Sequence, residues 1–148
     1  MGFTESIRTV LKQKYATFSG RASRSEYWWF TLFYTLVLAA FVFVGLVIDW
    51  FAGSSADFYQ AYLIVIIPVA IFMLATLVPF IALQVRRFHD RNLSGWWYLL
   101  LLVLGAVPYA GFFASIASLV ITILKGTDGP NKFGADPLRP EATADIFA

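Results

Sequence analysis

Residues 27–48 read YWWFTLFYTLVLAAFVFVGLVI and contain no Asp, Glu, Lys or Arg. Residues 61–83 and 96–124 share this property, so half of the chain lies in three charge-free blocks. As helices, the first two blocks reach roughly 33–35 Å, which matches a bilayer hydrocarbon core of about 30 Å. A soluble chain of 148 residues has too little other sequence to cover three such helices. We therefore predict an all-α membrane protein, a small helical bundle that forms a single membrane domain over residues 1–148.

Composition and charge support this class and argue against others. Hydrophobic residues make up 59% of the chain and charged residues 14%, against roughly 45–50% and about 25% in soluble domains. The formal net charge of +2 is too small to favour nucleic acid as a partner. The basic residues form short clusters beside the blocks, a pattern that suits an anionic membrane surface. Because cysteine is absent, the chain has no thiol chemistry and no cysteine-based metal site.

The third block, residues 96–124, is too long for one straight span. As a single helix it would reach about 43 Å, and it contains Gly105, Pro108 and Gly111 near its middle. Proline removes a backbone donor and clashes with the preceding turn, so we predict a break between Gly105 and Gly111. Either one kinked helix crosses the bilayer, or two short helices form a hinged pair that enters and leaves on the same side. The chain then has three or four membrane helices.

The basic residues predict the orientation in the membrane. Lys and Arg precede the first block and follow the second, whereas the connection of residues 49–60 has Asp49 and Asp57 but no Lys or Arg. Because cytoplasmic connections are enriched in Lys and Arg, we predict a multi-pass membrane protein with a cytoplasmic N-terminus. The turn-rich tail of residues 125–148 has three basic residues, and a hinged pair would place all eleven inside. This argument favours the hinged pair.

The segments beside the blocks have predicted structures of their own. Residues 3–18 carry apolar side chains at helical spacing, which predicts an amphipathic helix, either at the membrane surface or packed on the cytoplasmic end of the bundle. Ser23, at capping-box spacing from Glu26, and Ser94 are predicted N-caps, and Gly126 is a predicted C-cap. Four tryptophans fall in the first helical turns and are predicted anchors at headgroup depth: Trp28, Trp29, Trp96 and Trp97.

Three polar segments flank the blocks. Residues 18–28 read FSGRASRSEYW, residues 86–97 read RRFHDRNLSGWW and residues 126–137 read GTDGPNKFGADP. In order and spacing they match the motifs of the bacterial domain-of-unknown-function family 805. From about Tyr15 to Leu138 the chain resembles the YhaH-like and YhaI-like inner membrane proteins of that family, although Ala135 stands where they commonly have proline. The resemblance implies a small multi-span protein of the bacterial cytoplasmic membrane and no particular activity.

Five arginines lie within a few residues of a membrane helix end on one face of the bilayer. Arginine binds phosphate through two parallel N–H groups, and juxtamembrane basic residues gain about 1 kcal/mol each near an anionic leaflet. In one interpretation these residues only determine topology and reach toward headgroups. In the other they share one anionic group, a lipid headgroup or an acidic partner segment, with the carboxylates as internal counter-charges. The candidate residues of that site are Arg21, Arg24, Glu26, Arg86, Arg87, His89, Asp90, Arg91, Asn131 and Lys132.

The sequence gives little support for catalysis or metal binding. His89 is the only histidine, and His89 with Asp90 falls short of a zinc centre or a catalytic triad. We expect His89 to bind a loop carbonyl and Asp90 to pair with an arginine, and we expect no enzyme, no metal and no cofactor. The predicted function is an interaction or structural module, with anionic lipids of the bilayer and a homo-oligomer or another membrane protein as partners. The alternative is an oligomeric channel or transporter component, for which Pro68, Pro79 and Gly105–Gly111 provide helix breaks.

Overall fold

The computed structural model describes residues 1–52 and 58–139 and consists of helices joined by short connections and a tail. In chain order the helices are α1 (Phe3–Arg8), the π-helical segment η1 (Thr9–Gln13), α2 (Arg24–Ala52), α3 (Phe58–Asp90), α4 (Gly95–Gly105) and α5 (Ala110–Ile123). Asp57 and residues 140–148 of the predicted tail lie outside the described residues. Two helical stretches in the described part, Arg24–Phe51 and Tyr62–Asp90, are long and apolar enough to cross a membrane. The prediction of an all-α membrane protein is confirmed.

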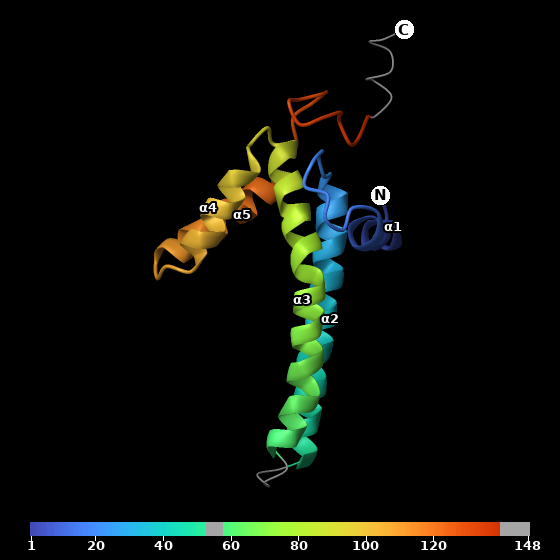
Figure 1. Ribbon diagram of the computed structural model, residues 1–148, viewed down its shortest axis with the longest axis vertical. Helices are drawn as coiled ribbons and strands as arrows, with labels where there is room; N and C mark the ends of the chain where they lie inside the picture. Colours follow the sequence, from blue (N-terminus) through green and yellow to red (C-terminus); the bar gives the residue numbers. More distant parts are fainter. Residues whose placement is uncertain (53–57, 140–148) are drawn as a thin grey trace.

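Helices α2 and α3 form one long antiparallel pair (Figure 1). Aromatic rings fill their facing sides: Tyr34 of α2 packs against Phe72 and Phe80 of α3, with centroids 5.3 and 5.2 Å apart. Phe41 continues this contact 6.1 Å from Phe72. Other large side chains point outward, such as Leu74, which is 70% exposed. Such a surface is unfavourable in water, so hydrocarbon tails are the environment that suits it.

The third charge-free block is two short helices, α4 and α5, joined by residues 106–109. This is the hinged pair, and the alternative of one kinked helix is wrong. Pro108 lies in the turn, and Gly111 passes close to Gly105, where a Cβ on Gly111 would lie 2.6 Å from the Gly105 carbonyl oxygen. Figure 1 shows the pair slanting away from α3, with its two outer ends near the same end of the long pair.

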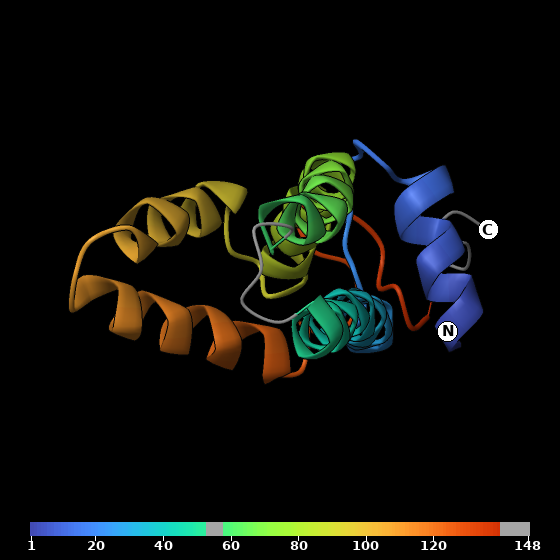
Figure 2. The same ribbon diagram turned by 90° about the horizontal axis from the view of Figure 1, so that it is seen from below.

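The predicted amphipathic helix of residues 3–18 is too long, because the helical segment ends at Gln13. Helix α1 lies crosswise beside the long pair, which Figure 2 shows end-on. Val10 is fully buried in a cluster with Phe30 of α2 and Leu83 of α3. Of the two predicted arrangements, the structure has the helix packed on the end of the bundle.

Tyr15 explains why the helix ends early. Its hydroxyl donates a hydrogen bond to the Ala75 carbonyl oxygen of α3, at 2.6 Å. In a regular helix that carbonyl would accept from the amide of residue 79. Pro79 has no N–H to give. Tyr15 therefore supplies the missing donor, and residues beyond Gln13 leave the helical path to reach it.

Replacing Tyr15 with Phe removes this donor, and we expect a loss of about 1 kcal/mol in the free energy of unfolding, because the Ala75 carbonyl is left without a partner. The measurement is unfolding by SDS in mixed micelles, followed by tryptophan fluorescence. Tyr34→Phe is the matched control, since the Tyr34 ring packs between α2 and α3 and its hydroxyl makes no hydrogen bond in the described residues. Pro79→Ala restores an N–H at position 79, so Tyr15→Phe should cost less in that background. Equal costs in both backgrounds would rule this account out.

Candidate functional site

The three polar segments meet at one end of the α2–α3 pair, where α1 and the tail also lie (Figure 1). Residues 1–26, 84–92 and 124–139 form this end, which we call the head. All eleven Lys and Arg residues of the chain are in these segments. Asp49 of α2 lies near the opposite end of the pair. The fold thus brings together the segments that were predicted to form one site.

Asp90 lies at the centre of the head, between two arginines. Its Oδ1 accepts a hydrogen bond from Arg21 Nε at 2.9 Å, and its Oδ2 is paired with Arg87 Nη1. Asp90, Arg21 and Arg87 are 4%, 5% and 0% exposed. A carboxylate buried to this extent is stable when its charge is paired and its oxygens are hydrogen-bonded. Asp90 meets both conditions, as expected from the sequence.

Arg87 also binds the end of helix α5. Its Nε donates to the Thr122 carbonyl at 3.1 Å, its Nη2 donates to the Leu124 carbonyl, and its Nη1 lies 3.3 Å from the Ala22 carbonyl. The last carbonyls of a helix lack helical partners and form the negative end of its dipole, so a guanidinium is favourable there. One side chain therefore joins α3, the end of α5 and the segment before α2.

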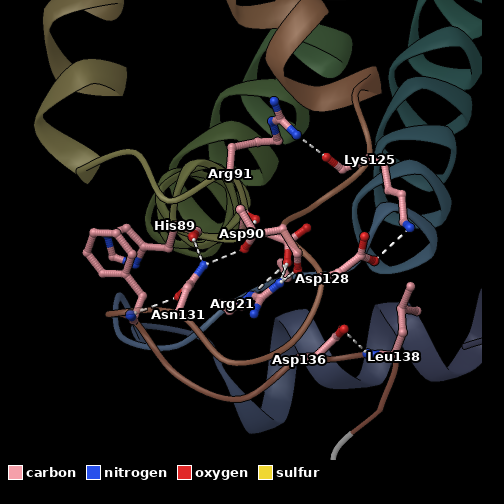
Figure 3. Close-up of polar contacts among 12 residues, drawn as sticks. Arg21, His89, Asp90, Arg91, Lys125, Asp128, Asn131, Asp136 and Leu138 are labelled. Atoms are coloured by element: carbon pink, nitrogen blue, oxygen red, sulfur yellow. Dashed lines mark hydrogen bonds and ion pairs between the residues drawn. The ribbon is translucent and has the colours of Figure 1, made fainter.

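Arg21 holds the tail against the head (Figure 3). Its Nη1 and Nη2 donate to the carbonyls of Gly129 and Thr127, both at 2.6 Å. The Thr127 amide in turn donates to the Asp90 carbonyl oxygen at 2.9 Å. Arg21 and the tail are more than a hundred positions apart in the sequence, so these contacts close the chain on itself.

Polar side chains of the tail fix its turns. The amide nitrogen of Asn131 donates to the His89 carbonyl at 3.0 Å and to the Thr127 hydroxyl at 2.9 Å. Asp136, which is 7% exposed, accepts from the Gly129 amide at 3.2 Å. Asp136 was not a predicted site residue. Its position directly before a proline is typical of a turn, and that is the role it has here.

Gly126 is not the helix C-cap that its position predicts. Helix α5 ends at Ile123, and the C-cap is Leu124, with φ −58° and ψ 146°. The chain leaves the helix early, and in this conformation Arg87 reaches the Leu124 carbonyl. Gly126 has a different requirement: a Cβ there would overlap the Asp90 carboxylate. The position needs glycine because the backbone approaches Asp90 closely.

A second buried ion pair joins α2 and α3 beside α1. Glu26 Oε1 is paired with Arg86 Nη1, and these residues are 2% and 0% exposed. Ser23 caps α2 as predicted, since its Oγ accepts from the Glu26 amide at 3.2 Å, but the Glu26 carboxylate faces Arg86 and does not complete a capping box. Ser6 of α1 donates to the Glu26 carbonyl at 2.6 Å. Among the described residues, Arg86 Nε and Nη2 have no hydrogen-bond partner. The pair thus fixes where α1, α2 and α3 meet.

His89 has a structural environment. Its Nδ1 lies 3.1 Å from the Gly20 carbonyl oxygen, so this nitrogen carries the proton that the bond requires. The imidazole stacks on Phe133 of the tail, with centroids 3.9 Å apart and 3° between the planes. Lys132 Nζ lies 5.0 Å from the centroid of the same Phe133 ring. The expectation that His89 binds a loop carbonyl is confirmed, and the ring serves as a platform for the tail.

The remaining candidates lie at the surface of the head. Arg24 is exposed, and Arg91 Nη1 donates to the Lys125 carbonyl. Lys125 Nζ pairs with Asp128 at 2.6 Å, with side chains 60% and 80% exposed. The hydrogen bond from Lys125, and then its charge, hold the pKa of Asp128 below its usual value. A pair this exposed adds little to stability, so these residues remain available to solvent or to a membrane surface.

The four predicted tryptophan anchors lie at the same end of the molecule. Helices α2 and α4 both begin in or beside the head (Figure 1), and Ser94 caps α4 as predicted by accepting from an amide at 3.5 Å. The indole rings belong to the first turns of these helices and are at least partly exposed: Trp28 38%, Trp29 39%, Trp96 77% and Trp97 54%. This placement suits rings at one headgroup layer.

All ten predicted site residues lie in or at the edge of the head, but the buried arginines bind groups of the chain itself. Many of their partners are backbone carbonyls, which every residue type has, so residue type gave no signal for Thr122, Leu124 or Thr127. Gln84, whose amide donates to the Tyr27 hydroxyl at 2.9 Å, was also missed. The sequence did offer a signal for Gln84, because a single polar amide directly follows the apolar block of residues 61–83. Within residues 1–52 and 58–139, no group of three His, Cys, Asp or Glu side chains is placed to hold a metal ion.

Comparison with known proteins identifies the family. The protein family described as "Protein of unknown function (DUF805)" matches residues 15–135 of the chain. The chain belongs to this family. It is 37% identical over 129 residues to "Inner membrane protein YhaI" of Escherichia coli (strain K12), covering 87% of this chain and 92% of the relative. It is 38% identical over 128 residues to "Inner membrane protein YhaH" of the same strain, covering 86% and 92%. No solved structure matches the chain.

A third relative has a name that describes no activity. "Uncharacterized protein YiiR" of Escherichia coli (strain K12) is 29% identical over 147 residues, covering 86% of this chain and 90% of the relative. The family resemblance predicted from the three polar segments is confirmed by the family match. The names of YhaI and YhaH indicate the inner membrane, and none of the three names a reaction, so function has to be argued from the head and the helices.

Removing the charge of Asp90 tests the centre of the head. In Asp90→Asn, two buried guanidinium groups lose their shared counter-ion, and we expect a loss of about 3–5 kcal/mol in the free energy of unfolding. Asp128→Asn is the matched control, because that carboxylate belongs to an exposed pair, and its unfolding midpoint should not change. Unfolding in SDS mixed micelles compares the two. Equal midpoints would show that Asp90 does not hold the head together.

Gly126→Ala tests the close approach of the tail to Asp90. The added methyl group overlaps the carboxylate, so we expect the tail to detach and trypsin to cleave after Lys132 roughly tenfold faster or more. Gly105→Ala is the control, since a Cβ there meets no atom within 4 Å. Cleavage is followed by mass spectrometry of the detergent-solubilised protein. Unchanged cleavage in Gly126→Ala would contradict this role.

Proposed function

We propose that this DUF805 protein is a non-enzymatic interaction and structural module of the cytoplasmic membrane. In this proposal the head faces the cytoplasm, with the N-terminus and the tail on that side, and its exposed basic residues bind anionic lipid headgroups. The observation that carries the proposal is the segregation of all eleven Lys and Arg residues to the head. This segregation follows the enrichment of basic residues on the cytoplasmic side of membrane proteins.

Nine of the eleven basic residues of the head are either buried or exposed, and the other two, Lys14 and Arg91, are half-buried. Arg21, Arg86 and Arg87 are at most 5% exposed and have Asp90, Glu26 and backbone carbonyls as partners. They therefore stabilise the head. The exposed group supplies the proposed headgroup contacts and consists of Arg8, Lys12, Arg24, Lys125, Lys132 and Arg139.

The magnitude of the electrostatic attraction supports this role. A basic side chain near an anionic leaflet gains about 1 kcal/mol, so several exposed residues together give a clear preference for anionic over zwitterionic lipid. Arg24 begins α2 four positions before Trp28, so its charge lies close to the rings that are expected at headgroup depth. The buried ion pairs fix the backbone of the head, so the exposed basic side chains extend from segments whose positions are fixed.

Native mass spectrometry of the detergent-solubilised protein, with equal amounts of phosphatidylglycerol and phosphatidylcholine, tests the proposal. We expect the wild type to retain phosphatidylglycerol preferentially. Arg8→Gln and Arg24→Gln should each lower the ratio of the two retained lipids by about fivefold, because about 1 kcal/mol is lost per charge. The matched controls Arg8→Lys and Arg24→Lys keep the charge and should keep the ratio.

Three results would overturn the proposal. Equal retention of the two lipids by the wild type would exclude the headgroup role, and an acidic partner segment would then be the remaining anionic group. A ratio that falls equally in the Lys and Gln variants would show that charge is not the determinant. Selective ion flux in proteoliposomes would replace a structural module with the channel or transporter alternative.

A further inference from the structure

The α4–α5 hairpin presents apolar side chains over almost its whole surface. Its buried residues are Gly95 and Tyr98 on α4 and Ala114 and Thr122 on α5. No charged residue occurs from residue 96 to residue 124. Bulky side chains along both helices and the turn are 47–89% exposed: Leu100, Leu102, Val103, Val107, Tyr109, Phe112, Phe113, Leu119 and Ile123. Such a surface requires an apolar environment on all sides.

The hairpin is too short to cross a bilayer. Helix α4 has 11 residues and α5 has 14, which correspond to roughly 17 and 21 Å of helix. The hydrocarbon core is about 30 Å thick, so each helix matches one leaflet. Both outer ends of the hairpin lie near the head, and Figure 1 shows the turn to the side of α3, at about the level of its middle and well short of its far end. Figure 2 shows the hairpin projecting sideways from the long pair.

The turn satisfies most of its own backbone groups, which lipid requires of any exposed segment. The amide of Ala106 donates to the Val103 carbonyl at 3.1 Å, and the amide of Val107 donates to the Leu104 carbonyl at 3.0 Å. On the return, the Ala110 amide donates to the Pro108 carbonyl and the Gly111 amide to the Val107 carbonyl, both at 2.8 Å. Pro108 has no N–H to satisfy. The backbone of the turn is therefore suited to an environment without water.

The root of the hairpin is attached firmly to the head. Tyr98 packs on Phe88 of α3 with centroids 5.7 Å apart, and Arg87 binds the carbonyls of Thr122 and Leu124 at the end of α5. Because both helices are held at this end, their direction relative to α3 is fixed. The exposed Trp96 and Trp97 mark the same end, which suits headgroup depth.

We infer that the α4–α5 hairpin is a wedge that binds the acyl chains of a single leaflet, the leaflet on the side of the head. The turn, with Tyr109 at 89% exposed, lies near the bilayer midplane. The partner of this surface is lipid hydrocarbon. The inference concerns depth and does not depend on the charge of the headgroups, so it can fail or stand separately from the proposed function.

The absence of cysteine makes single-cysteine labelling a direct test. Tyr109→Cys and Phe113→Cys place a thiol at the turn and in the first turn of α5, at side chains 89% and 69% exposed that support little packing. Ala135→Cys marks the head, and Ser54→Cys marks the connection between α2 and α3. A membrane-impermeant maleimide is applied to intact spheroplasts and to inverted vesicles, and all samples are labelled again in SDS.

The wedge predicts that Tyr109→Cys and Phe113→Cys react from neither side and react fully in SDS. Ala135→Cys should react on one side only and Ser54→Cys on the other, and this pair separately tests the proposed orientation. Labelling of the turn from the Ala135 side would place the hairpin on the surface. Labelling of the turn from the Ser54 side would make the hairpin a full crossing. Either result would overturn the inference.

Lipid contact at the turn is measured with a bimane fluorophore on Tyr109→Cys. In liposomes, lipids brominated deep in the acyl chain should quench it more strongly than lipids brominated near the headgroup. Fluorescence that neither lipid quenches, together with disulfide cross-linking between Tyr109→Cys copies, would show that a second copy covers the hairpin. That outcome would also overturn the inference. Phe113→Cys repeats the measurement in case the turn variant does not fold.

Discussion

The head depends on one carboxylate that two arginines share. Asp90 is buried between Arg21 and Arg87, and each guanidinium also donates hydrogen bonds to backbone carbonyls of other segments. Without this negative charge, two cations would lie in a region of low dielectric with no counter-ion. Charge-assisted hydrogen bonds are also directional, so the same contacts fix the path of the tail and the angle of the α4–α5 hairpin.

The α2–α3 pair and the head are stabilised by different forces. Along α2 and α3, aromatic rings pack against one another at a tilt, and this kind of contact tolerates small shifts. In the head and on the part of α3 beside it, carbonyls that lack a helical donor accept hydrogen bonds from specific side chains: Arg87 donates to the end of α5, and Tyr15 donates to Ala75, which Pro79 leaves without an N–H. Irregular backbone is tolerated near a membrane only where such partners exist. The polar segments are the parts of the chain that provide them.

Much of this fold was predictable from residue chemistry, because a membrane core excludes charge. The block boundaries follow from where Asp, Glu, Lys and Arg stop, and the break around Pro108 follows from the missing N–H. The predictions failed where a distant segment decides the conformation. Tyr15 leaves its helix to reach α3, and Gly126 passes close to Asp90. Neither contact can be predicted from the neighbouring residues in the sequence. The carbonyl partners of Arg87 cannot be predicted from residue type either, because every residue has a backbone carbonyl.

The closure of the tail onto Arg21 has a consequence for biosynthesis. Arg21 binds the carbonyls of Thr127 and Gly129, more than a hundred positions later in the chain. While a ribosome is still making that last segment, the α2–α3 hairpin is already available for insertion, and Arg21 and Asp90 are still hydrated. The contacts of Arg21 with the tail can form only after Thr127 and Gly129 have been made. A nascent chain released before Gly129 would lack these acceptors, so Arg21 would stay more hydrated and the head would be more accessible to proteases.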